Sequence, residues 1–72
     1  MHPIARYRTG LGWSQVDLAE RIGVHPNTVL AWEKGARPRP KQLAKLAEVL
    51  GIGGVALLDE IIQWSEYTKA AA

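Results

Sequence analysis

Apolar residues recur along this chain at intervals of three and four positions. Three segments show this spacing clearly: Leu18, Ala19 and Ile22; then Leu43, Leu46, Ala47 and Leu50; and finally Leu57, Leu58 and Ile61. Residues at these intervals share one face of a helix, whereas a half-buried strand alternates at every second residue. No alternating stretch of useful length occurs, so the pattern predicts an all-α fold.

Prolines, glycines and capping residues divide this pattern into five predicted helices. Proline suits the first turn of a helix, and Pro3 and Pro26 stand where a helix is expected to begin. Ser14 and Asp17 have the spacing of a capping box, whereas His25 is a weak capping residue by type. The predicted helices cover residues 3–9, 15–22, 26–34, 40–50 and 55–67, with an extended proline-containing linker at 36–40.

The segment 14–34 combines three residue types at the spacing of a helix-turn-helix. Ala19 stands where two helix axes must approach closely, and a larger side chain there would push them apart. Gly23 falls in the turn, where a residue that tolerates positive φ is needed. Val29 falls on the face that packs back onto the first of the two helices. Together these residues predict a helix-turn-helix whose second helix contacts DNA.

Length and composition exclude several classes of protein. A chain of 72 residues is expected to form one domain, 1–72. It has no cysteine, which excludes disulfides and thiolate metal sites and suits a reducing cytoplasm. No apolar run approaches the roughly 18 residues that span a bilayer. We therefore expect a cytoplasmic protein without a membrane segment.

Charge is distributed unevenly along the chain. Residues 1–45 contain eight Lys and Arg against three acidic residues, a net charge of +5, whereas residues 46–72 contain one against four, a net charge of −3. A basic end favours a polyanionic partner. Charge alone fits a solvated surface equally well, but together with the helix-turn-helix it favours nucleic acid.

Six short segments carry a family resemblance: 12–15 (Gly-Trp-Ser-Gln), 18–19 (Leu-Ala), 22–24 (Ile-Gly-Val), 28–29 (Thr-Val), 32–35 (Trp-Glu-Lys-Gly) and 43–51. Through them the chain resembles the Cro and phage-repressor (Xre-like) helix-turn-helix family over about residues 4–62. The resemblance implies a compact five-helix bundle of the lambda-repressor type. It also implies binding to double-stranded DNA, usually as a homodimer on a pseudo-palindromic operator, with a recognition helix at about 26–34 in the major groove.

The resemblance implies base contacts from the outward face of the recognition helix: Pro26, Asn27, Thr28, Leu30 and Ala31. The Asn27 amide can form two hydrogen bonds with adenine. Leu30 and Ala31 offer only apolar contact, for instance to thymine methyl groups. Family members often carry longer polar side chains here, so we expect sparse direct readout.

Further roles follow from the same resemblance. Gln15, at the start of a helix, is expected to hold a DNA phosphate; the alternative is a glutamine that faces solvent. Arg8 and Glu33 match positions that form an ion pair; the alternative is two independent surface charges. Phosphate contacts are also expected from a basic group, for which the alternative is a solvated linker: Lys34, Arg37, Arg39 and Lys41.

The last predicted helix has more apolar side chains than one inward face requires. Leu57, Leu58 and Ile61 are expected to close the core and to leave a second set outside it as a dimer interface: Val55, Ile62 and Trp64. Exposed apolar surface of this kind marks a partner site. The alternative is a core helix with one tryptophan at its rim.

Enzymatic interpretations find little support. His2 and His25 are far apart and lack a clustered carboxylate or cysteine partner, so neither a catalytic nor a metal site is predicted, and no cofactor is expected. The leading hypothesis is a DNA-binding transcription regulator, a repressor. The alternative is a protein-interaction module on the same scaffold, such as an antitoxin-like partner, which the apolar Leu30 and Ala31 favour.

Overall fold

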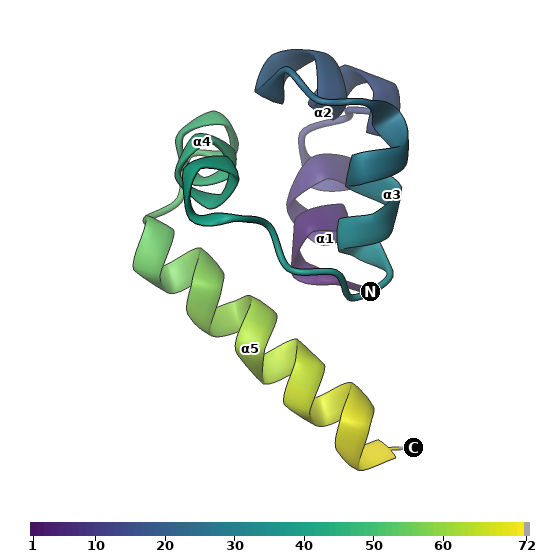
Figure 1. Cartoon of the computed structure of the whole chain (residues 1–72), viewed down its shortest axis with the longest axis vertical. Coiled ribbons are helices and arrows are strands. Elements are labelled where there is room, and N and C mark those ends of the chain that lie inside the picture. Colours follow the sequence, from purple (N-terminus) through teal and green to yellow (C-terminus); the bar gives the residue numbers. More distant parts are fainter. Residues whose placement is uncertain (72) are drawn as a thin grey trace.

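The computed structural model describes residues 1–71, and the side chains of residues 1–69 (Figure 1). The chain forms five helices: α1 (Pro3–Gly10), α2 (Gln15–Ile22), α3 (Pro26–Glu33), α4 (Pro40–Leu50) and α5 (Gly54–Ala71). No strand occurs in this part of the chain, and the all-α prediction is confirmed. The bounds of α2 and α4 match the predicted ones. α3 ends one residue earlier than predicted, and α5 continues four residues past the predicted end.

The ends of α2 show why the helix-turn-helix forms locally. The Asp17 N–H donates to the Ser14 hydroxyl at 3.0 Å, and the Ser14 N–H donates to the Asp17 carboxylate at 2.8 Å. This reciprocal capping box satisfies two of the donors left open at a helix start. At the other end Gly23 has φ +86°, a left-handed conformation that suits glycine. The turn into α3 is therefore determined by residue type.

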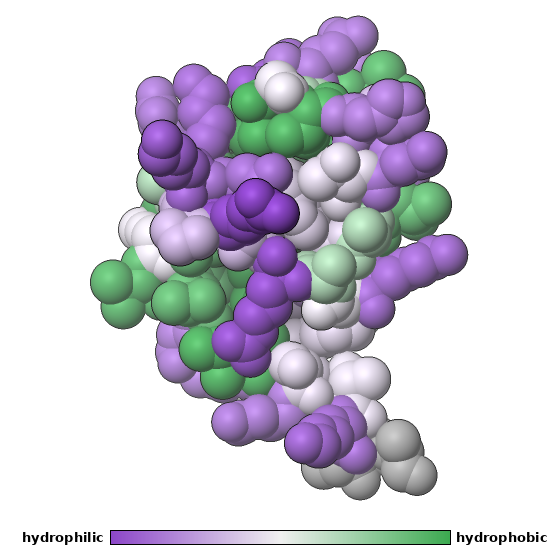
Figure 2. Space-filling model, in the orientation of Figure 1, coloured by the Kyte–Doolittle hydropathy of each residue, from purple (hydrophilic) through white to green (hydrophobic). Residues whose placement is uncertain are grey.

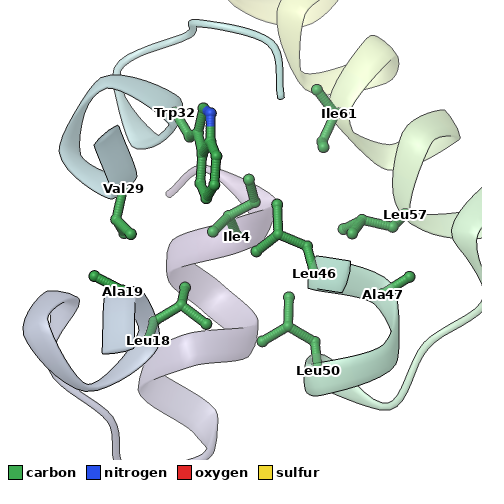
Figure 3. Packing of buried hydrophobic residues seen from close by; sticks show 10 residues of the cluster. All are labelled: Ile4, Leu18, Ala19, Val29, Trp32, Leu46, Ala47, Leu50, Leu57 and Ile61. Carbon is green, nitrogen blue, oxygen red and sulfur yellow. The ribbon is translucent and has the colours of Figure 1, made fainter. Parts of the chain in front are cut away.

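Side chains from all five helices meet in one core (Figure 3): Ile4, Leu18, Ala19, Val29, Trp32, Leu46, Ala47, Leu50, Leu57 and Ile61. Ala19 and Val29 are both buried, as the helix-turn-helix spacing requires. Leu58 is 38% exposed, so the expectation that it closes the core is wrong. Successive residues on a helix point about 100° apart. Leu57 and Ile61 lie on the buried face of α5, and Leu58 points away from Leu57 toward the edge of that face.

The N-terminal residues pack against the far end of α5. His2 is buried, and its Nδ1 accepts the Ile4 N–H at 3.1 Å, which caps α1. Its ring meets the Trp64 ring edge-on, with the centroids 4.6 Å apart. Trp64 is thus half-buried inside the chain, which fits the alternative of a tryptophan at the rim of the core better than a fully exposed interface residue. Arg6 and Tyr7 fasten α1 to the same helix, because both donate hydrogen bonds to the Glu60 carboxylate.

Candidate nucleic-acid interface

The two sides of α3 differ in burial. Val29 and Trp32 lie in the core, whereas Asn27, Leu30 and Ala31 are exposed. Pro26 and Thr28 are half-buried. The helix is therefore fixed from behind by apolar packing and presents a short outer face that combines an amide with small or apolar side chains.

His25 begins this helix and caps it with its side chain. Nδ1 of His25 accepts the Asn27 N–H at 3.0 Å, and the His25 carbonyl accepts the Thr28 N–H at 2.9 Å. The imidazole is exposed. Histidine is a poor capping residue by statistics, but here its ring nitrogen takes the position that a serine or aspartate oxygen normally occupies.

A charged network behind the outer face joins three helices. Arg8 Nε donates to Glu33 Oε2 at 2.7 Å, and Arg8 Nη2 donates to Glu33 Oε1 at 3.2 Å. The predicted ion pair is therefore present, with the side chains only 13% and 10% exposed. Arg8 Nη1 also donates to the Trp13 carbonyl at 2.8 Å. This bidentate geometry fixes α1 against the end of α3.

Gln15 belongs to the same network. Its Nε2 donates to Glu33 Oε1 at 3.0 Å, so the amide is held between α2 and α3 and does not face solvent freely. The second hydrogen of that amide and the N–H groups of Gln15 and Val16 make no hydrogen bond among the described residues. Donors at a helix start that lack an internal partner suit an anionic oxygen. The beginning of α2 is thus a preformed donor site.

Four basic side chains follow α3 on the connection to α4 and on its first turn. All are exposed, and within the described residues none forms an ion pair: Lys34, Arg37, Arg39 and Lys41. Pro38 and Pro40 keep this connection extended. The charges are therefore spread along the chain beside the end of α3 and remain available to a polyanion.

Comparison with known proteins decides the family. A helix-turn-helix family model matches residues 4–57. The chain belongs to the Xre/Cro-like helix-turn-helix family. It is 41% identical over 61 residues to a protein from Methanothermobacter thermautotrophicus described as an uncharacterized HTH-type transcriptional regulator, a match that covers 79% of this chain and 88% of the relative. No solved structure matches the chain significantly.

Family membership identifies the helix-turn-helix as a DNA-binding motif. Proteins of this family generally do not catalyse reactions. None of the helices described is both long and apolar enough to cross a membrane. No group of His, Asp or Glu in the described part of the chain is arranged to hold a metal ion.

Sequence reasoning missed the capping role of His2 and underestimated that of His25, which it treated as a weak capping residue. The signal was available, because each histidine directly precedes a proline, in His2-Pro3 and His25-Pro26. Proline favours the first helical position, so the residue before it becomes the N-cap. Only the residue type, which is rare at that position, argued against a capping side chain.

Proposed function

We propose that this protein is a cytoplasmic transcriptional repressor that binds a pseudo-palindromic operator in double-stranded DNA as a homodimer. In this proposal α3 enters the major groove and sets its outer face against base edges. The division of α3 into a buried side and an exposed side carries the proposal, because a recognition helix must be fixed from behind while its outer side chains reach the bases. Selection from a random DNA pool followed by footprinting tests it, and two protected half-sites are expected.

Sequence preference is proposed to come mainly from Asn27, with Thr28 beside it. A bidentate contact discriminates between bases by about 1–3 kcal/mol, whereas phosphate contacts hold the protein without reading sequence. Asn27→Ala is therefore expected to relax the preference for the selected site, while Arg37→Ala weakens binding to selected and scrambled DNA alike. Equal losses on both DNAs for Asn27→Ala would show that this residue does not read a base.

Most of the affinity is proposed to come from phosphates. The supporting observations are the exposed basic side chains after α3 and the open donors at the start of α2. A dimer that neutralises roughly 6–8 phosphates gives a log–log dependence of affinity on salt with a slope of about −5 to −7. A slope near zero, or no binding to any DNA at low salt, would contradict the proposal.

The homodimer is proposed to form through α5. Val55 is 86% exposed and Leu58 is 38% exposed, and helical spacing places both with the half-buried Ile62 on one face, away from Leu57 and Ile61. Apolar side chains gather on the surface where α4 leads into α5 (Figure 2). A two-fold axis at this face would set the two recognition helices about 34 Å apart, one turn of DNA. Trp64 is a lesser contributor, because His2 already covers part of it.

Ile62→Asp tests the dimer. It is expected to reduce cooperative binding to a full palindrome and to leave affinity for a single half-site nearly unchanged. Ala56→Asp is a matched control, since it adds the same charge at an exposed position of α5 outside this face. Sedimentation that shows only monomer, together with footprints of one half-site at high protein concentration, would exclude the dimer.

One observation favours a second function. Val16 is 49% exposed and Leu30 is 36% exposed, so the helix-turn-helix carries two apolar side chains on its surface. A protein-interaction module, such as an antitoxin-like partner, would use such a surface to bind a protein. Failure of the chain to bind any DNA at low salt, together with a stable complex formed through these side chains, would favour this alternative.

A further inference from the structure

The start of α3 is closed to phosphate by its own cap. Pro26, at the first helical position, has no N–H to offer. The next two N–H groups are used by His25: Asn27 donates to the ring at 3.0 Å and Thr28 donates to the carbonyl at 2.9 Å. At the start of α2, in contrast, the N–H groups of Gln15 and Val16 are open. The two helices of the motif therefore present different chemistry at their N-termini.

The cap also determines where the His25 proton resides. A ring nitrogen that accepts a hydrogen bond carries no proton, so the neutral imidazole has its hydrogen on Nε2. The cap engages Nδ1, and Nε2 makes no hydrogen bond among the described residues. Because the cap anchors the exposed ring next to Asn27, the Nε2–H is a donor whose position relative to α3 is constrained.

We propose that His25 is a further DNA-contacting residue, whose Nε2–H donates a hydrogen bond to an acceptor of the bound duplex beside the first turn of α3. This inference rests on the proposed function. The acceptor is either a phosphate oxygen or a base edge, where guanine presents both N7 and O6 in the major groove. In either case one side chain has two roles: Nδ1 holds the helix start, and Nε2 binds DNA in place of the N–H groups that the cap has used.

The two roles can be separated by substitution. His25→Ser retains a capping side chain but loses the outward donor, whereas His25→Ala loses both. We expect His25→Ser to melt at the same temperature as the parent chain and to bind DNA about tenfold more weakly per protomer, the effect of one hydrogen bond. His25→Asn serves as a second cap-retaining variant if the serine variant folds poorly.

Chemical synthesis gives a sharper version of the same test, because the chain has only 72 residues. Nε2-methylhistidine at position 25 retains the Nδ1 acceptor and removes only the outward N–H. Full affinity of this protein, or of His25→Ser, for DNA that the parent chain binds would overturn the inference. Absence of DNA binding by the parent chain would instead overturn the proposed function, so the two failures are distinguishable.

Binding assays with modified DNA distinguish a phosphate acceptor from a base acceptor. If it is a phosphate, the methylated protein loses affinity equally for selected and scrambled duplexes, and an uncharged methylphosphonate at one backbone position abolishes the difference from the parent. If it is a guanine, the loss is confined to the selected site, and an analogue at one position abolishes the difference: 7-deazaguanine for a contact to N7, or 2-aminopurine, which lacks O6, for a contact to O6. Either result supports a contact from Nε2.

Discussion

The two helix starts at His2-Pro3 and His25-Pro26 have nearly the same local structure and opposite surroundings. In both, proline occupies the first helical position and the histidine Nδ1 accepts the N–H of the second helical residue, at 3.1 Å in α1 and 3.0 Å in α3. The backbone at the caps is also similar, with ψ 142° and 145°. His2, however, is 3% exposed under Trp64, whereas His25 is open to solvent.

This difference shows that the dipeptide determines the cap and that tertiary packing determines what the rest of the ring does. The Nε2 of His2 is buried and makes no hydrogen bond in the described part of the chain. It cannot reach an external partner, so its ring acts as packing between α1 and α5. His25 leaves its Nε2 outside, where a ligand can reach it.

The largest effect is expected at Glu33, whose charge acts on the buried His2. The charge of Glu33 raises the pKa of His2, and its carboxylate accepts hydrogen bonds from Arg8 and Gln15. Glu33→Ala leaves the guanidinium of Arg8 poorly solvated and without its partner, which costs about 3–5 kcal/mol in the free energy of unfolding. Urea denaturation measures this loss. The double variant Arg8→Met with Glu33→Leu is expected to lose less, and an equal or larger loss would contradict the assignment.

Next in size is removal of the buried cap. His2→Ala deletes both the hydrogen bond to Ile4 and the packing against Trp64, and we expect a loss of about 2–4 kcal/mol in the free energy of unfolding. His2→Asn retains a capping side chain and should recover only part of the loss. A loss as small as that for an exposed cap would mean that the contact with Trp64 contributes nothing.

The buried histidine also predicts a dependence of stability on pH. Burial lowers the pKa of His2 below its usual 6.5, although the charge of Glu33 partly offsets this effect. Below pH 6.5 the unfolded chain therefore binds the proton more readily, and the free energy of unfolding falls as the pH falls. One proton limits the slope to about 1.4 kcal/mol per pH unit. The difference in the free energy of unfolding between the parent chain and His2→Asn isolates this contribution, and this difference should become independent of pH above neutral pH.

Much of the fold could be predicted from local sequence. Ser14 and Asp17 cap α2 as their spacing indicates, and Ala19, Gly23 and Val29 occupy the positions that the motif requires. These features depend on residues close together in the chain. The pair Arg8–Glu33 was also predicted, but only through the family resemblance.

The features that sequence could not predict depend on contacts between distant segments. Nothing near Trp64 in the chain predicts that its ring is partly covered, because the residue that packs on it is His2, 62 positions earlier. Glu60 is a second example, because it accepts hydrogen bonds from Arg6 and Tyr7 of α1. Helical spacing shows which side chains share a face, but not which partner that face meets.

The smallest effect on stability is expected at the exposed cap. His25→Ala removes only the hydrogen bond to Asn27, because the ring is exposed, and we expect a loss of about 1 kcal/mol in the free energy of unfolding. Amide hydrogen exchange should show faster opening at the start of α3 while α1 stays protected. Equal losses for His25→Ala and His2→Ala would contradict the contrast between the two caps, since they would then contribute alike despite their different burial. A small loss of stability together with a large loss of DNA affinity would support it, because the exposed ring would then serve DNA binding more than folding.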